Sequence, residues 1–355
     1  MPNNSMNPMR KRRILSSWRT RAVAAGWCVG AQIFLAGCSV GMPLSLNGTW
    51  LAALAAPPFC AWLVLRCRRR LYAAQHHAHS SAYLLLAISL LSSGAFACTS
   101  LVGFASQTLV QQSRPIWTEA AALLGVLFCA LGGGTGTARL CFALRWAAAV
   151  LVLCLSLTSV PMRMPVGLFP ILGAGAEPLG LSALCMLFGA APALMLMLPP
   201  PELENTPSQR FVPPAGFFLA RVLPGALIGI LLLFLTGTCT TYESIARSSE
   251  WGARLRMAAG NQPHEGVLQM ILILTKLTAM VLLSSNMICA AQQALGLAIP
   301  TLRRKGASLI AAGCLLAAAL AVPLLFGDAP LLVASPLITI PSALAAWILG
   351  RRQAA

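Results

Sequence analysis

The residue that fits least well with its surroundings is Lys276, which lies in the apolar run Leu272–Thr278. An ammonium group inside a membrane is costly unless it faces a cavity or a partner, so this lysine is a candidate functional residue. It would replace a coupling cation or contact an anionic group. The alternatives are that its long side chain reaches the outer interface or that the span ends before it. Further along the predicted helix, Ser284, Ser285 and Asn286 either line a polar path or hydrogen-bond between helices.

Two clusters of helix-weakening residues mark places where a ligand could bind. The first is Gly37–Pro43, and the second is Phe188–Pro192, about one half-chain later. Secondary transporters use such broken helices to present backbone groups to a substrate near mid-membrane. The alternative for the first cluster is a helix that ends at Pro43 and uses small residues for close packing. The candidate ligand-binding residues are Gly37, Ser39, Gly41, Phe188, Gly189 and Lys276.

The sequence gives little support for an enzyme or for a bound cofactor. It holds no nucleophile with a partnered base and no dinucleotide fingerprint, and the Gly-rich stretch Gly132–Thr137 lacks the Gly-Lys-Thr ending of a phosphate loop. His76, His77 and His79 lie in a basic loop, where a solvated surface is a better explanation than a metal site. Most cysteines lie inside apolar runs and behave as small hydrophobes. We expect no catalytic residues, no metal and no cofactor.

The composition indicates a membrane protein. Of the 355 residues, 58% are hydrophobic and only 9% are charged, whereas soluble domains carry about a quarter charged residues. The net charge of +17 could suggest nucleic acid as a partner, but the basic residues cluster in short loops without interleaved aromatic residues. We therefore expect no nucleic-acid binding and interpret the basic loops as a topology signal beside anionic lipid.

Ten apolar segments approach the length of about 20 residues that a membrane-spanning helix needs. The expected fold is therefore an all-α integral membrane protein with about ten transmembrane helices. The predicted spans are Ala22–Met42, Thr49–Leu65, Tyr83–Val110, Trp117–Gly134, Cys141–Val160, Pro178–Leu198, Phe217–Thr238, Val267–Leu295, Ala307–Phe326 and Leu331–Leu349. They form one domain, 22–349, between a basic tail, 1–21, and a short tail, 350–355. The halves 22–160 and 178–349 suggest an inverted repeat of five plus five helices.

The positions of the basic residues favour cytoplasmic termini. Basic residues are retained on the cytoplasmic side during insertion. Of the 25 Lys and Arg, the gaps assigned to the outside hold only Arg114, Arg163, Arg247, Arg254 and Arg256, and Lys276 lies inside a span. A wrong number of spans would destroy this alternation.

The start of the chain also resembles a lipoprotein signal. A basic segment and an apolar stretch precede Leu35–Cys38, and cleavage there would acylate Cys38. We favour an uncleaved first span, because the apolar run continues past Cys38 and because loss of this span would spoil the charge alternation.

Several stretches resemble one family. Met164–Leu179, together with Phe188-Gly189 and Leu196–Pro199, is similar to the region of the fifth and sixth spans in the B subunits of spore germinant receptors. These proteins belong to the amino acid/polyamine/organocation (APC) transporter superfamily. Three further places are similar to the same family: Asn47–Ala52, Gly136–Arg139 and Gln292–Leu295.

The resemblance implies a ten-span, LeuT-like fold that binds an amino acid or another small germinant between its first and sixth spans. It also implies A-type and C-type partner subunits in the inner membrane of a spore. Ala190 departs from the pattern, since family members often carry an acidic residue after the Phe-Gly pair. The alternatives are an amino acid permease of the same superfamily and, more weakly, a structural membrane protein without a ligand.

Overall fold

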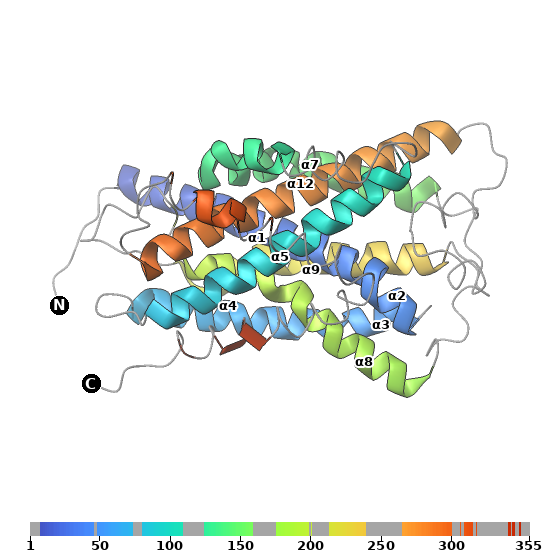
Figure 1. Ribbon diagram of the computed structural model, residues 1–355, viewed down its shortest axis with the longest axis horizontal. Coiled ribbons are helices and arrows are strands. Elements are labelled where there is room, and N and C mark those ends of the chain that lie inside the picture. The colour runs from blue at the N-terminus through green and yellow to red at the C-terminus, as the bar shows by residue number, and fades with distance from the viewer. Residues whose placement is uncertain are drawn as a thin grey trace.

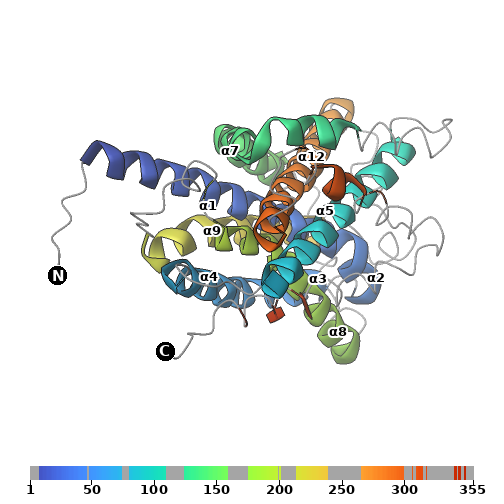
Figure 2. The same ribbon diagram turned by 60° about the vertical axis from the view of Figure 1, so that its left-hand side comes forward.

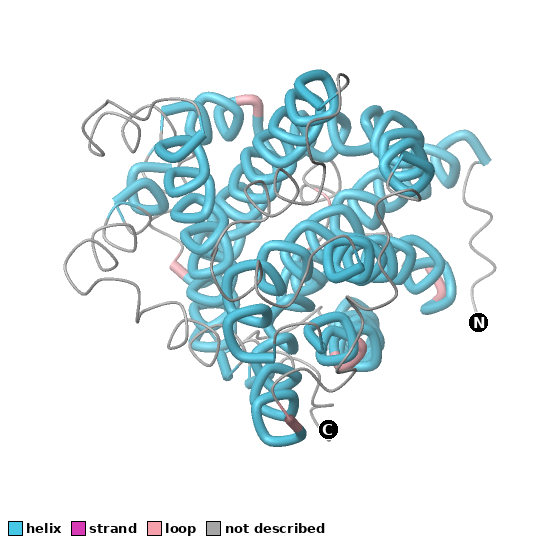
Figure 3. Tube along the Cα trace, turned by 90° about the vertical axis from the view of Figure 1, so that its right-hand side faces the viewer, coloured by secondary structure: helices cyan, strands magenta, loops and turns pink. Residues whose placement is uncertain are grey.

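The chain is helical throughout the part that the structure, a computed structural model, describes. The described residues are 8–45, 48–73, 80–108, 124–158, 175–198, 200, 213–238, 265–299 and short pieces between 306 and 348. The helices are α1 (Pro8–Ala36), η1 (Gly37–Gly41), α2 (Met42–Ser45), α3 (Thr49–Ala53), α4 (Ala56–Ala73), α5 (Ser80–Thr108), α7 (Gly133–Thr158), α8 (Ala176–Met186), η5 (Leu187–Met197), α9 (Ala215–Thr238) and α12 (Glu265–Ala298). No strand occurs among these residues, as Figure 3 shows from the end of the bundle.

The helices pack as a bundle around α1. Figure 1 shows α1 running lengthwise through the molecule, with α5 and α12 crossing in front of it. Helix α1 packs against α9, η5, α7 and α12, and α5 packs along α12. Figure 2 shows the N-terminal turns of α1 projecting beyond the other helices. The segment 8–21, predicted as a tail, is thus continuous with the first helix, and the bundle encloses the later part of α1.

Five helical segments of the described residues are long and apolar enough to cross a membrane, and they correspond to five of the predicted spans. They are Thr49–Arg66, Tyr83–Ser100, Ala176–Met197, Ala215–Phe234 and Leu277–Ala298. A further candidate is the pair Leu124–Leu131 and Gly133–Leu144, bent by 100°. The predicted spans Ala307–Phe326 and Leu331–Leu349 lie largely outside the described residues, so the total of ten and the inverted repeat stay predictions.

The Gly-rich turn between the predicted fourth and fifth spans is shorter than expected. Only Gly132 is non-helical, and Gly133 begins α7 with a φ of 74°, a conformation that glycine adopts without steric cost. Helix α7 therefore begins at Gly133 instead of near Cys141.

The first predicted span is not among these five apolar segments, because α1 carries Arg19, Arg21 and Gln32. Other helices cover most of α1 from Arg21 onward. Its buried face includes Ala25, Cys28, Val29 and Ile33. A helix that contacts protein on most sides does not need an apolar surface all round, which is why α1 can carry polar side chains inside the bundle.

Helices α1 and α9 approach each other through four glycines. Gly26 and Gly30 are spaced four residues apart on α1, and so are Gly225 and Gly229 on α9. A Cβ atom on Gly229 would lie 2.5 Å from the carbonyl oxygen of Gly30, and one on Gly225 would collide with the backbone of Gly26. This small-xxx-small pattern is a sequence signal of close helix packing that our sequence analysis did not use.

We expect Gly225→Ala to destabilise the protein, because the added methyl group forces the two backbones apart. Overpacking of this kind costs about 1–3 kcal/mol. Gly216→Ala on the same helix is the control, since its Cβ would meet no atom within 4 Å. Thermal unfolding in detergent should show a lower midpoint for Gly225→Ala alone. Equal midpoints for the two variants would contradict the close α1–α9 contact.

Candidate functional site

The first helix break lies where the sequence predicts it. Helix α1 ends at Ala36, and the π-helix η1 follows over Gly37–Gly41 before α2 begins at Met42. Short π-helical segments are rare and occur frequently at functional sites. Gly37 is buried against Leu233 of α9. The backbone of Ser39 belongs to η1, but its side chain lies outside the described residues.

The second break is a change of helix type. Helix α8 ends at Met186, and the chain continues as the 3₁₀-helix η5 over Leu187–Met197. Eleven residues are long for a 3₁₀-helix, which rarely exceeds about four. Every residue from Phe188 to Met197 is buried. The Phe188 ring packs edge to face on Phe96 of α5, with ring centroids 5.3 Å apart.

The two breaks lie against each other. A Cβ on Gly41 would be 2.5 Å from Thr49 Cγ2 and 3.0 Å from Met186 Cε at the end of α8. A Cβ on Gly189 would be 2.7 Å from Ile33 Cγ1 on α1. Gly41 and Gly189 are therefore needed as glycines because the broken helices are in contact. Of the predicted residues, Gly41 and Gly189 lie at contacts between the two broken helices, whereas Gly37 faces α9 and the Phe188 ring packs on α5.

Two carbonyls of η5 accept hydrogen bonds from side chains of α1. In a 3₁₀-helix each carbonyl bonds the N–H three residues later, and the Met195 carbonyl accepts from the Leu198 N–H at 3.3 Å. A carbonyl oxygen has two lone pairs, so the carbonyls of Phe188 and Met195 can each accept a side-chain donor as well.

Gln32 of α1 supplies the donor for Phe188. Its Nε2 donates to the Phe188 carbonyl at 3.1 Å and to Ser93 Oγ of α5 at 3.2 Å. The side chain has 0% exposure, and its Oε1 has no hydrogen-bond partner. Gln32 was not among the residues predicted from the sequence, although an amide in an apolar span, five residues before Gly37, is a detectable signal.

Arg21 of α1 supplies the donor for Met195. Its Nε donates to the Met195 carbonyl at 2.9 Å, and its guanidinium also donates to Gln293 Oε1 of α12 at 3.1 Å. Only 6% of Arg21 is exposed. The sequence analysis treated Arg21 as one of the basic residues that set topology, whereas here it joins α1, η5 and α12 inside the bundle.

Hydroxyl groups stabilise the far side of the first break. Ser45 Oγ lies 3.0 Å from the Gly41 carbonyl, 3.2 Å from Thr49 Oγ1 and 3.0 Å from Ser182 Oγ. These contacts join α2 and α3 to α8. Ser45, Thr49 and Ser182 are all buried.

The remaining polar candidates lie apart from the breaks. Lys276 is part of α12, but its side chain lies outside the described residues, so its role stays a prediction. Ser284 Oγ donates to the Gly94 carbonyl of α5, and Ser285 Oγ donates to the Val281 carbonyl of its own helix at 2.6 Å. Asn286 Nδ2 donates to the Leu282 carbonyl at 2.8 Å. These three residues make contacts within and between helices.

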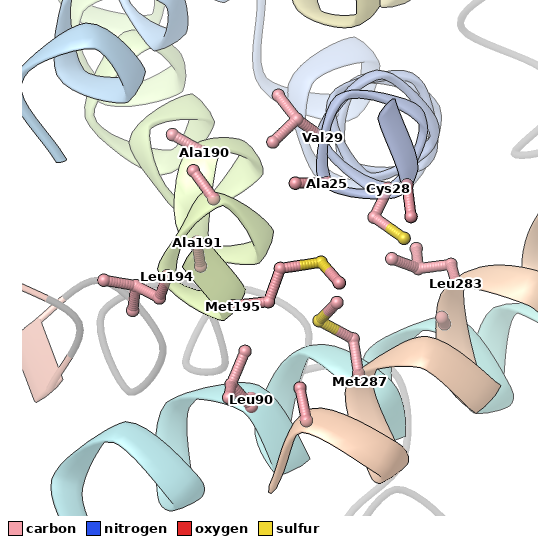
Figure 4. Close-up of a cluster of buried hydrophobic side chains, with 14 of the residues drawn as sticks. Ala25, Cys28, Val29, Leu90, Ala190, Ala191, Leu194, Met195, Leu283 and Met287 are labelled. Atoms are coloured by element: carbon pink, nitrogen blue, oxygen red, sulfur yellow. The ribbon is translucent and has the colours of Figure 1, made fainter. Parts of the chain in front are cut away.

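The space between α1, η5, α5 and α12 is filled by apolar side chains (Figure 4). Met195 and Met287 point toward each other there, and Cys28 and Leu283 lie nearby. Ala190 is buried in the same cluster, on the side of η5 where Val29 of α1 lies. Cys38, the residue of the lipobox-like motif, is buried within η1.

The arrangement of the helices is similar to that of a solved membrane transporter. No protein-family model matches the chain, and no curated protein matches it. The fold is similar to solved structures of a manganese transporter from Eremococcus coleocola. The structure in complex with an aromatic bis-isothiourea substituted compound has a TM-score of 0.52 at 12% identity, over 96% of this chain and 78% of that chain. Two mutants of that transporter give TM-scores of 0.51 and 0.50 at 15% identity, over 98% of this chain and 79% of theirs.

This likeness concerns the fold alone. It confirms the predicted class, an all-α, multi-pass membrane protein with a transporter fold.

We expect Arg21→Ala to destabilise the bundle, because the carbonyl of Met195 would lose a charged donor in a buried place. Hydrogen bonds to charged groups contribute about 1.5–3 kcal/mol. Arg13→Ala is the matched control, since Arg13 is exposed on the same helix. Thermal unfolding should separate the two variants, with Arg13→Ala within about 0.5 kcal/mol of the wild type. An equally small effect of Arg21→Ala would show that these bonds contribute nothing to stability.

Proposed function

We propose that this chain is a transporter-like membrane protein that binds a small molecule where its two broken helices meet. The observation that carries the proposal is the contact between the π-helical break at Gly37–Gly41 and the α8–η5 segment, which lie far apart in sequence. Broken helices at corresponding places of two half-chains are the usual position of a substrate site in secondary transporters.

The specific role that we propose is that of a transporter-like subunit of a nutrient germinant receptor. The support is the resemblance of Met164–Leu179 and the stretches that follow it to the B subunits of these receptors. In this role the protein senses an amino acid or similar molecule and acts with A-type and C-type subunits in the spore inner membrane. Ligand binding would favour one packing of the helices over another, and the partner subunits would respond to that change. The distribution of basic residues supports cytoplasmic termini.

An amino acid permease of the same superfamily is the second candidate. The likeness in fold favours the permease, because the similar solved structures are those of a manganese transporter. A structural membrane protein without a ligand is the weaker alternative, for which changes at the helix breaks would alter stability only.

Manganese does not fit the described residues at the breaks. Mn²⁺ prefers carboxylate, carbonyl and water oxygens. The described side chains at the breaks supply an amide, hydroxyls and thioethers, and among the described residues no group of three His, Cys, Asp or Glu could hold a metal ion. Glu177 is exposed at the start of α8. We therefore propose an uncharged or zwitterionic ligand in place of a divalent cation.

A ligand that binds only the native state stabilises the protein and so raises its melting temperature. At a ligand concentration of 100 times the Kd, the free energy of unfolding rises by about 2.7 kcal/mol. We expect at least one amino acid of a panel to stabilise the purified protein. Gly41→Leu should abolish this shift, because the new side chain would occupy the place of Thr49 and Met186. Lys276→Ala should weaken the shift if the ammonium contacts the ligand.

Gly180→Leu is the matched control for this experiment, because a Cβ at Gly180 would meet no atom within 4 Å. It should keep the wild-type shift. Uptake of the stabilising amino acid into proteoliposomes would favour the permease, whereas co-purification of two partner subunits without uptake would favour the receptor. A protein that no amino acid stabilises, and that neither transports nor co-purifies with partners, would contradict both.

A further inference from the structure

Gln32 holds an acceptor that the fold does not use. The identity of its amide atoms is fixed, because the atom facing the Phe188 carbonyl must be a donor and is therefore Nε2. Both hydrogens of Nε2 then have acceptors, namely the Phe188 carbonyl and Ser93 Oγ. Oε1 is left fully buried without a donor. A buried acceptor without a partner is unfavourable, and such groups in folded proteins call for an explanation.

The structural task of Gln32 does not explain its oxygen. The carbonyl of Phe188 takes a donor only, which a serine, lysine or arginine would also provide. An amide brings an additional acceptor to the same place, between α1, α5 and η5. The rings of Phe96 and Phe188, whose centroids are 5.3 Å apart, provide apolar surface on α5 and η5, the two elements that accept hydrogen bonds from the amide.

We infer that Gln32 Oε1 is a ligand-binding atom that accepts a hydrogen bond from an N–H group of the bound molecule. This inference rests on the proposed function and adds a residue that neither the resemblance nor the helix breaks identify. Ser93 and the Phe188 carbonyl hold the amide so that its oxygen keeps one orientation. An ammonium donor is favoured over a hydroxyl, because hydrogen bonds from a charged donor are roughly twice as strong as neutral ones. The ligand reaches Oε1 only when the surrounding helices separate, since Gln32 has no exposed surface.

Asn286 provides a matched comparison. It is also a buried amide with an unpartnered oxygen, and its Nδ2 is likewise fixed by a carbonyl, that of Leu282. Its second contact is Cys141 Sγ of α7 at 3.4 Å. Asn286 of α12 therefore donates to α7 and to its own helix, and not to either of the two broken segments.

The test measures the melting temperature of the purified full chain against increasing concentrations of glycine, L-alanine, L-valine and L-leucine, and of the hydroxy acids with the same carbon skeletons. The wild type should be stabilised by at least one amino acid and not by its hydroxy acid. For the same rise in melting temperature, Gln32→Met should need a concentration of that amino acid at least about ten-fold higher than the wild type needs. Asn286→Leu should melt at a lower temperature without ligand but keep the wild-type concentration dependence.

Gln32→Glu is the second variant, because the carboxyl group in its neutral form donates to the Phe188 carbonyl through its O–H and keeps one acceptor oxygen at the same distance from the backbone. It should retain the response that Gln32→Met loses. The inference is overturned if Gln32→Met responds like the wild type, if Gln32→Glu loses the response, or if the hydroxy acid stabilises as well as the amino acid. If no compound stabilises the wild type, the proposed amino acid binding fails and the inference fails with it. If the wild type is stabilised by an amino acid but one of these three outcomes is found, the inference alone fails and the proposed amino acid binding stands.

Discussion

The hydrogen-bond requirement of backbone carbonyls inside a membrane is the constraint on which the centre of this protein depends. The carbonyls of Phe188 and Met195 in η5 accept hydrogen bonds from α1, through Gln32 and Arg21. Ser45 of α2 donates to the carbonyl of Gly41, four residues earlier in the first break. One broken helix therefore stabilises the backbone of the other as well as its own, which explains why the two breaks lie together.

This arrangement requires α1 to be surrounded by protein. The glycines that α1 shares with α9 allow the two backbones to touch, and the side chains on the remaining faces of α1 reach η5, α7 and α12. An interior helix can carry an arginine and a glutamine because its neighbours, and not lipid, receive their hydrogen bonds. The same burial leaves Gln32 with an oxygen that only a further molecule can satisfy.

Much of the fold was predictable because membrane spans are long and their apolarity is local in sequence. The positions of both helix breaks were predictable as well, since glycine and proline act on their own helix. The side chains that bond to the backbone at those breaks were not predictable, because they depend on which helices lie side by side. Gln32 pairs with Phe188 across 156 positions, and Arg21 pairs with Met195 across 174. Gly133–Gly136 joined a helix instead of forming a loop, because α-helical hydrogen bonds in an apolar bundle outweigh the flexibility of glycine.

Disulfide formation between Ser45→Cys and Ser182→Cys would test the contact of the two breaks most directly. The two hydroxyl oxygens are 3.0 Å apart, a separation that lets replacing sulfurs bond. The experiment uses a variant without the 12 native cysteines and a mild oxidant in membranes. We predict rapid cross-linking of this pair, and none when Ser45→Cys is combined with Ser16→Cys on the exposed start of α1. Equal cross-linking of both pairs, or none of either, would contradict the account.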